Sequence, residues 1–420
     1  MRKNGEPQTF SILALGMVQF LVLAAPVTAQ IPCEYEVTTL QFPIDCGLGT
    51  VITTGLSLNE NGAVVGTYRC PLWTFFQGFM WTAEAGFEAL DPPEGVIEVF
   101  AADINDHGVI CGTLLVSGVG NRAFVYDNGE WTILPPVVDV PGARCSANAI
   151  NNAGIVAGQR SLTEELNPQN AYIWSAEKGF TDLGVMNGPN SAATDVNEFS
   201  WVCGWTGNTF FAPDARAFLW TGEKAIILEA VPGGFQSAAF ALNNKSLLAG
   251  SGRVEIKGFP IGAPRAFIWE DGRFTMLGTL PDHLLSRSKD VNDEGIVVGN
   301  SSNVGGNPNI FHAFIWTEGA MNDLNDFIDP RLPLLLRSAP GIANTGQIIA
   351  NGNHDAGETL SFLLIPRKSP LGDLDGDCIV GVSDLLILLG EWGQRDSPAD
   401  LNGDGIVGVK DLLILLGNWG

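Results

Sequence analysis

The sequence predicts a mainly β protein, a seven-bladed β-propeller that is followed by a small helical module. Three observations lead to this prediction. A unit of about 46 residues occurs seven times, each unit contains four short strand-like segments, and the last fifty residues carry a different, duplicated motif. The 51 Gly and 24 Pro residues, with only 16% charged residues, fit many short strands and turns better than long helices.

Each unit begins with a hairpin in which an Asn opens the turn and an apolar strand ends in Gly. Leu58-Asn59-Glu60-Asn61-Gly62, for example, leads to Val64-Val65-Gly66. The turn residues of the seven copies are Asn59, Asn105, Asn151, Asn197, Asn243, Asn292 and, degenerately, Ala343. The first five are 46 residues apart, and the later gaps are 49 and 51 residues. Because Asn tolerates positive φ, we expect turn formers here rather than ligands.

The second recognisable element of each unit is a strand with an aromatic residue in its first position and, in five copies, Trp in its third. The copies are Phe79-Met80-Trp81, Phe124-Val125-Tyr126, Tyr172-Ile173-Trp174, Phe218-Leu219-Trp220, Phe267-Ile268-Trp269, Phe314-Ile315-Trp316 and Phe362-Leu363-Leu364. Residues two apart on a strand share a face, so each copy should bury a stacked aromatic pair. A turn and a fourth strand follow, and four strands in about 46 residues match a propeller blade.

The two ends of the repeat region predict that the propeller closes into a ring. The seventh copy stops at Ile365-Pro366 without a fourth strand, and an orphan strand, Glu36 to Leu40, precedes the first copy. If the N-terminal strand completes the last blade, no long edge stays unpaired. The alternative is an open β-solenoid, which would not need the borrowed strand.

Residues 36–365 resemble the extracellular HAF-type repeats, named for a His-Ala-Phe element that stands here as His312-Ala313-Phe314. Most copies depart from it at the His, with Arg122, Arg216 and Arg265 in its place. The resemblance implies an extracellular location and a repeat architecture, and it implies no particular chemistry.

The N-terminus predicts export. Arg2 and Lys3 precede an apolar stretch from Phe10 to Ala25, and Val27-Thr28-Ala29 provides small residues for cleavage. We therefore expect a signal peptide over residues 1–29 and a secreted, cell-surface or periplasmic protein, with an uncleaved membrane anchor as the alternative. No later segment is apolar for long enough to span a bilayer, and the formal charge of −24 argues against nucleic acid as a partner.

Long loops of varied sequence are predicted to gather at one end of the propeller, where a glycan or protein ligand would bind. Two of them are rich in aromatic residues, which suit sugar rings or extended peptides if they are exposed. The candidates are Tyr68, Trp73, Phe75 and Phe76 in the first blade, and Trp205, Phe210 and Phe211 in the fourth. The alternative is that these rings only cap the blade ends.

No catalytic motif is visible, so we expect a binding protein rather than an enzyme. Asp103, Asp195 and Asp290 share one slot in alternate blades, where they would hold a cation, act as acid and base, or accept backbone hydrogen bonds in their own hairpins. We favour the last of these. The four His residues suggest no metal triad, and no Gly-x-Ser-x-Gly or His-Glu-x-x-His motif occurs. A polysaccharide hydrolase or lyase is the alternative, because paired carboxylates can lie far apart in the chain.

The seven cysteines divide by their place in the repeat. Cys111 and Cys203 occupy a small apolar slot and should be buried thiols. Cys46 and Cys70 flank the first hairpin at the loop-rich end, which predicts a disulfide between them. The pattern gives no partner for Cys33, Cys145 or Cys378.

Residues 371–420 form a separate module after a propeller that spans residues 30–368. Two copies of an acidic loop lie 27 residues apart, and each precedes an apolar helix, Leu385 to Leu389 or Leu412 to Leu416. Oxygen ligands at loop positions 1, 3, 5 and 12, with a carbonyl at position 7, wrap one Ca²⁺. The loops therefore predict two calcium ions, held by Asp373, Asp375, Asp377, Ile379 and Asp384, and by Asp400, Asn402, Asp404, Ile406 and Asp411.

This module is similar to a type I dockerin, and that resemblance implies a cohesin-like or cell-surface protein as its partner. Three residues depart from the usual pattern. Gly381 and Gly408 replace the polar residue at position 9, and Cys378 stands where the first loop normally has Gly. Val382-Ser383 and Val409-Lys410 lie where dockerins read their partner. The whole chain is thus interpreted as an exported binding or surface-display protein.

Overall fold

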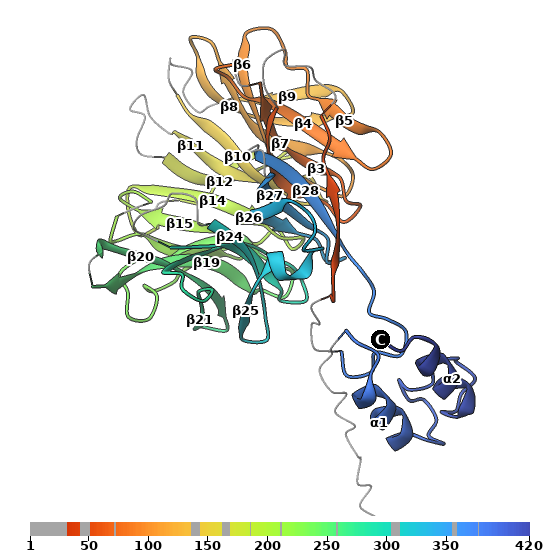
Figure 1. Cartoon of the computed structure of the whole chain (residues 1–420). Coiled ribbons are helices and arrows are strands. Elements are labelled where there is room, and N and C mark those ends of the chain that lie inside the picture. The colour runs from red at the N-terminus through yellow and green to blue at the C-terminus, as the bar shows by residue number, and fades with distance from the viewer. Residues whose placement is uncertain are drawn as a thin grey trace, which may run out of the picture.

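The computed structural model (Figure 1) describes residues 32–42, 51–70, 73–135, 143–161, 169–184, 186–210, 212–257, 259–303, 311–354, 359–376 and 378–420. Within these residues the strands form seven four-stranded antiparallel sheets, which are the seven blades predicted from the repeat. The predicted signal segment, residues 1–29, lies outside the described part of the chain. No helix in the described part is long and apolar enough to cross a membrane.

The first four blades follow the repeat from its innermost strand outward. Blade 1 is β2 (Ile52–Leu58), β3 (Val64–Arg69), β4 (Gln77–Thr82) and β5 (Gly86–Ala89). Blade 2 is β6 (Val96–Ile104), β7 (Ile110–Val116), β8 (Gly120–Asp127) and β9 (Glu130–Leu134). Blade 3 is β10 (Cys145–Ile150), β11 (Val156–Ser161), β12 (Gln169–Ser175) and β13 (Gly179–Asp182). Blade 4 is β14 (Asn190–Val196), β15 (Val202–Gly207), β16 (Arg216–Trp220) and β17 (Ala225–Ile227).

The last three blades have the same order, except that the final one borrows a strand. Blade 5 is β18 (Ala238–Leu242), β19 (Leu248–Ile256), β20 (Phe259–Glu270) and β21 (Arg273–Gly278). Blade 6 is β22 (Leu285–Val291), β23 (Val297–Ser302), β24 (Phe311–Thr317) and β25 (Ala320–Asp323), with a short 3-10 helix η1 (Leu324–Phe327) after it. Blade 7 is β26 (Leu334–Ile342), β27 (Ile348–His354) and β28 (Thr359–Pro366), completed by β1 (Tyr35–Thr39).

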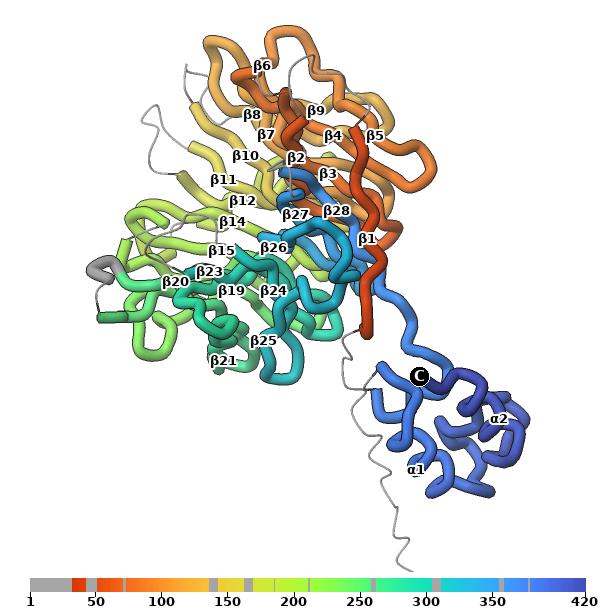
Figure 2. The backbone as a smooth tube through the Cα atoms, viewed as in Figure 1, coloured from red at the N-terminus to blue at the C-terminus, as the bar shows by residue number. Residues whose placement is uncertain are grey.

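The predicted ring closure is confirmed. β1 pairs antiparallel with β28 in a continuous register that runs from Tyr35 opposite Pro366 to Thr39 opposite Phe362. Figure 2 shows the red N-terminal strand against the blue strand from the far end of the repeat. Because the first and last strands of the repeat region share one sheet, an open solenoid is excluded.

The glycine at the end of each hairpin strand makes room for the aromatic core. The first-position aromatics, such as Phe124 and Phe314, are completely buried. A Cβ at Gly112 or Gly299 would collide with a carbonyl oxygen of the bulged innermost strand and with that aromatic ring. In blades 1, 2, 3 and 5 the ring also packs against an aromatic of the fourth strand, as Phe124 does with Trp131 at 4.9 Å between ring centres, a contact that the sequence analysis did not predict.

The turn Asn residues bind their own turns, as expected, and they also join neighbouring blades. In Asn151, Oδ1 accepts a hydrogen bond from the Ile155 backbone N–H, while Nδ2 donates to the carbonyl of Asn197 in the next blade. The same bond from Nδ2 to the next blade runs from Asn59 through to Asn292, with lengths of 2.9 to 3.3 Å. The seventh turn has Ala343, so the seam from blade 7 to blade 1 lacks this bond.

A second ring of hydrogen bonds, made by the residue after each turn Asn, does cross that seam. Each backbone N–H donates to a side-chain oxygen of the equivalent residue in the next blade, over 2.6 to 3.2 Å. The last of these bonds runs from the Asn344 N–H to the Glu60 carboxylate, which returns the ring to blade 1. The seven members are Glu60, Asp106, Asn152, Glu198, Asn244, Asp293 and Asn344.

Beyond the propeller the chain forms two helices, α1 (Val382–Gly390) and α2 (Val409–Gly417). Both follow an acidic loop, as the duplicated motif predicts. Their shared core is small and consists of Val380, Leu388, Ala399, Val407 and Leu415.

Candidate functional site

The aromatic cluster of blade 1 forms an exposed hollow at the loop-rich end of the propeller. Trp73 and Phe75 are 43% and 45% exposed, whereas Tyr68 is buried beneath them, 6.2 Å from Trp73 between ring centres. With Thr74 and Gln77 they line a hollow of ≈ 520 Å³. Exposed aromatic faces beside amide and hydroxyl groups suit a ligand that has both apolar and polar surfaces.

The neighbouring Phe76 and the blade 4 cluster are packed instead. Phe76 is half-buried, 5.9 Å from Phe100, with the Arg69 guanidinium 5.2 Å above its ring. Trp205 and Phe210 meet edge to face at 5.6 Å. Phe211 lies outside the described residues. Among the described rings of the two clusters, Trp73 and Phe75 of blade 1 are exposed, whereas Trp205 and Phe210 of blade 4 are half-buried.

At the opposite end, the two hydrogen-bonded rings line the mouth of the central channel, a hollow of ≈ 300 Å³. The carboxylates of Asp103, Asp195 and Asp290 lie on the innermost strands that lead into these turns. Each carboxylate ties its blade to the next. Asp195 accepts hydrogen bonds from the N–H groups of Val196 and, in the following blade, Leu242, both at 2.7 Å. Asp103 and Asp290 reach Ile150 and Ile342 in the same way. This geometry supports the structural interpretation of these acids and adds a role between blades that the sequence did not indicate.

Burial sets the protonation of these three acids. It raises the pKa of Asp195 to about 8, and the charges of Asp290 and Asp103 raise it further, against the backbone bonds that lower it. The pKa of Asp290 rises to about 6 for the same leading reason. Burial also raises the pKa of Asp103.

The first acidic loop of the C-terminal module brings carboxylates together. Oxygens of Asp373, Asp375 and Asp384 lie within 4.8 Å of one another. Asp384 is buried, and its two oxygens accept hydrogen bonds from the N–H groups of Leu374 and Gly381 at 2.6 and 2.7 Å. Ile379 is exposed at the loop surface, and Asp377 lies outside the described residues.

The second loop has a similar hydrogen-bond pattern, but among the described residues only the first loop brings three carboxylates within 4.8 Å of one another. Asp404 of the second loop pairs with the Lys410 ammonium at 3.0 Å. Asp400 accepts hydrogen bonds from the N–H groups of Gly403, Asp404 and Gly405, so the loop wraps around its carboxylate. Asp411 is buried, like Asp384, and accepts from Asn402 and Gly408. Ile406 is again exposed. The oxygen-rich donor sets of both loops fit a hard cation such as Ca²⁺.

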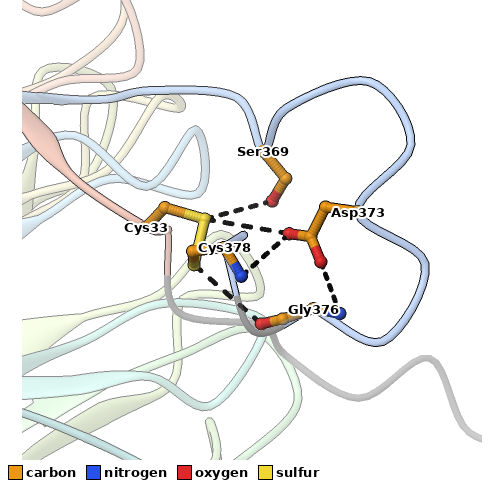
Figure 3. The surroundings of a disulfide bond; sticks show 5 residues. All are labelled: Cys33, Ser369, Asp373, Gly376 and Cys378. Atoms are coloured by element: carbon orange, nitrogen blue, oxygen red, sulfur yellow. Dashed lines mark hydrogen bonds between the residues drawn. A yellow bond between two sulfur atoms is a disulfide. The ribbon is translucent and has the colours of Figure 1, made fainter. Parts of the chain in front are cut away.

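A disulfide joins the first loop to the N-terminal end of the propeller. Cys378, at the sixth loop position with φ +75°, is bonded to Cys33, which lies two residues before β1. Figure 3 shows that the bond adjoins the first carboxylate of this acidic loop: the Cys33 Sγ lies 4.0 Å from an Asp373 oxygen, and the same oxygen accepts from the Cys378 N–H at 3.1 Å. The sequence had given no partner for either cysteine.

The other cysteines agree with their predicted environments where the structure describes them. Cys111 and Cys203 are free and buried, as expected, and so is Cys145. Cys70 is buried, but its predicted partner Cys46 lies outside the described residues. The Cys46–Cys70 bond therefore stays a prediction.

Both helices of the module present an apolar face that the other described residues of the chain leave exposed. The exposed residues come in pairs that are 27 positions apart, such as Leu386 and Leu413, each 64% exposed. Four such pairs lie on the helices or just after them: Val382 with Val409, Leu386 with Leu413, Leu389 with Leu416, and Trp392 with Trp419. Ile387 is exposed as well. Apolar surface that gathers in this way on a small domain marks an interaction site.

One cluster was missed by the sequence analysis, which treated the four His residues as scattered. His283 and His312 meet in blade 6, with ring centres 5.2 Å apart. The only available signal was that His312 departs from the Arg found at its position in three other blades.

A comparison with solved structures gives matches of low similarity. The β-propeller domain of the Trilobed protease from Pyrococcus furiosus is 10% identical, with a TM-score of 0.48, over 75% of this chain and 93% of that one. YCF48 bound to D1 peptide is 12% identical, with a TM-score of 0.46, over 82% and 100%. The SapL1 lectin in complex with alpha methyl fucoside is 11% identical, with a TM-score of 0.38, over 66% and 97%. Similarity this low carries no argument about function.

Neither a comparison with family models nor one with curated proteins gives a match.

Proposed function

We propose that this is an exported binding and surface-display protein. Its propeller holds a glycan or protein ligand, and its calcium-loaded C-terminal module attaches the propeller to a cohesin-like or cell-surface protein. The observation that carries this proposal is the duplicated apolar face of α1 and α2. It lies directly behind two acidic loops and is left exposed by the described part of the propeller.

Calcium would be held by the oxygen donors of the two loops. In the first loop these are Asp373, Asp375, Asp384 and the Ile379 carbonyl, and in the second Asp400, Asn402, Asp404, Asp411 and the Ile406 carbonyl. The ion would neutralise carboxylates that face one another and fix the start of each helix. A core of five buried residues is too small to order this module alone, which supports a contribution from metal binding.

The ligand would bind at the loop-rich end, over the exposed rings of Trp73 and Phe75. Binding without conversion is favoured because the carboxylates of Asp103, Asp195 and Asp290 are occupied by backbone hydrogen bonds. An acid–base pair needs carboxylates free to exchange protons with a substrate.

Two measurements on the full chain test this proposal. The first immobilises the chain on a sensor and passes a panel of polysaccharides and cell-envelope fragments over it, with calcium or with chelator. Calcium-dependent retention of envelope fragments is expected to be lost in Leu386→Glu with Leu413→Glu, whereas retention of a polysaccharide should be lost in Trp73→Ala with Phe75→Ala.

The second measurement follows reducing ends released from the same panel. Sustained release of product would replace the binding proposal with the enzymatic alternative. If neither the helix variant nor the aromatic variant changed the retention of envelope fragments or polysaccharide, both proposed binding surfaces would be refuted.

A further inference from the structure

The residue two positions before the core aromatic varies from blade to blade, and in blade 6 it is His312. In blades 2 and 4 the residue two positions before the core aromatic is Arg122 or Arg216, and its guanidinium donates to a backbone carbonyl of the segment that enters the next blade, at 2.9 and 3.0 Å. His312 holds this position in blade 6 and turns instead to Asp323, at the end of its own outer strand. Of the seven residues at this position, only His312 carries an imidazole, and a carboxylate of its own blade orients that ring.

Both imidazoles of the His283–His312 pair are oriented through Nδ1. Nδ1 of His312 is hydrogen-bonded to the Asp323 carboxylate, and Nδ1 of His283 lies 3.1 Å from the Ser301 hydroxyl. Asp323 is itself fixed, because its other oxygen accepts from the Asn325 N–H and side-chain amide. Within the described residues, neither Nε2 forms a hydrogen bond. Each ring therefore keeps one nitrogen for a ligand.

This is the arrangement in which histidines bind transition metals. A metal-bound His typically gives its other ring nitrogen to a carboxylate or similar group, which fixes its tautomer and orientation. Two imidazoles on one tetrahedral zinc ion, each about 2 Å from it, have ring centres on the order of 5 Å apart. The rings of His283 and His312 are 5.2 Å apart and meet at 89°.

The surrounding charge also favours a cation. Asp282 and Asp323 act electrostatically on His283, and Asp323 and Asp326 act on His312, against one nearby cation, Arg337. The side chain of His312 is 28% exposed, so an ion can reach it from solvent.

We propose that His283 and His312 bind a divalent transition-metal ion of the zinc class through their Nε2 atoms, with Asp323 as the positioning residue. Water, or a donor atom of a molecule held at the loop-rich end, completes the coordination. This site is independent of the calcium loops, whose oxygen donors select hard cations. A purely structural role, in which the His312–Asp323 bond only joins two strands, predicts no metal binding.

The test uses the full chain, stripped with chelator and then kept in excess Ca²⁺ so that the acidic loops do not compete. Calorimetric titration with Zn²⁺ should show one saturable site, and Mg²⁺ should show none there. His283→Gln and His312→Gln are each expected to weaken Zn²⁺ binding at least about tenfold, and Asp323→Asn about 10- to 100-fold. The matched controls are His107→Gln and His354→Gln, the remaining histidines of the chain, which should leave binding unchanged.

Two further readouts separate positioning from simple structure. Asp323 raises the pKa of His312, so Asp323→Asn should move the pH midpoint of Zn²⁺ binding downward. Nitrogen NMR of the unmodified chain should show Zn²⁺ shifting Nε2 of two histidines, which decides the question even if a variant fails to fold. Absence of binding to Zn²⁺, Co²⁺ and Ni²⁺ at millimolar concentration, or binding that survives His283→Gln with His312→Gln, would overturn the proposal.

Discussion

Cys33 and Cys378 are joined by a disulfide across 345 residues of sequence, with their Cα atoms 5.2 Å apart. One lies just before the strand that closes the propeller, and the other lies inside the first acidic loop. Glu34, next to Cys33, accepts a backbone hydrogen bond from Arg367 at 2.9 Å and also pairs with its side chain. The start of the ring and the start of the module are therefore held together at one point.

Loss of this disulfide should lower the stability of the whole propeller, and not only of the module. The bond restricts an unfolded chain over a very long loop, for which the entropy estimate reaches about 5 kcal/mol less any strain. We expect Cys33→Ser with Cys378→Ser to lower the guanidinium midpoint under non-reducing conditions. Ser369→Ala is the control, because its hydroxyl lies 3.6 Å from the Cys33 sulfur but does not make the bond. Equal midpoints for wild type and the double variant would contradict this prediction.

The carboxyl group of Asp195 should make the protein less stable as the pH rises. Its pKa is about 8 in the folded chain, above the ordinary value of 3.8, because burial disfavours its charged form. Folding therefore retains a proton, so the contribution of Asp195 to the free energy of unfolding is greatest below the unfolded pKa and declines as pH rises to the folded one. For one group the slope is at most about 1.4 kcal/mol per pH unit.

Denaturant unfolding at several pH values between about 5 and about 8 measures this effect. The free energy of unfolding of Asp195→Asn should decline less steeply with pH than that of the wild type. The altered hydrogen bonds of the variant should add a constant difference between the two curves. Parallel slopes would show that Asp195 is ionised throughout this range in the folded protein.

Restoring the missing member of the Asn ring should stabilise the seam between blades 7 and 1. Ala343 forms the same turn as the six Asn residues, with its N–H bonded to the Gln347 carbonyl at 2.9 Å. We expect Ala343→Asn to donate to the carbonyl of Asn59 and to raise the free energy of unfolding by about 1 kcal/mol, the usual net value of one hydrogen bond. Ala343→Leu adds similar volume without the amide, and equal destabilisation by both would mean that the site lacks room.

The two acidic loops should each account for one calcium ion. Asp384 and Asp411 are buried at the twelfth loop position, so Asp384→Asn or Asp411→Asn should reduce calorimetric stoichiometry from two ions to one and decrease the helical circular dichroism of the module. Asp396→Asn changes an exposed acid between the loops and serves as the control. Two ions bound by either loop variant would show that the ions lie elsewhere.

Most of the fold could be predicted from the repeat, because the sequence of each blade contains its own turn residues, strand Gly and core aromatic. Ring closure could be predicted for the same reason, since an unfinished blade at one end matched a spare strand at the other. The hydrogen bonds between blades could not be predicted. The local sequence of Asn151 indicates a turn former, and its bond to the Asn197 carbonyl forms only because the fold places the two blades side by side.

Contacts that depend on loops and termini could not be predicted from the sequence for a related reason. Nothing in the local sequence of Cys33 distinguishes Cys378 from five other possible partners. His283 approaches His312 only because the loop into blade 6 returns beside β24. The two aromatic clusters look alike as sequence, and packing alone decides that Trp73 is exposed while Trp205 contacts Phe210.

The disulfide also determines how the molecule bears tension. A pull on the C-terminal module reaches the propeller along two routes, through Arg367 into β28 and through Cys33 into β1. Tyr35 and Pro366 face each other in the ladder, so both strands are drawn from the same end and are not sheared past one another. A force that would otherwise separate β28 from its blade is instead shared by β28 and β1. If the module attaches the propeller to a partner, as proposed above, the chain is reinforced at the place where the load would enter.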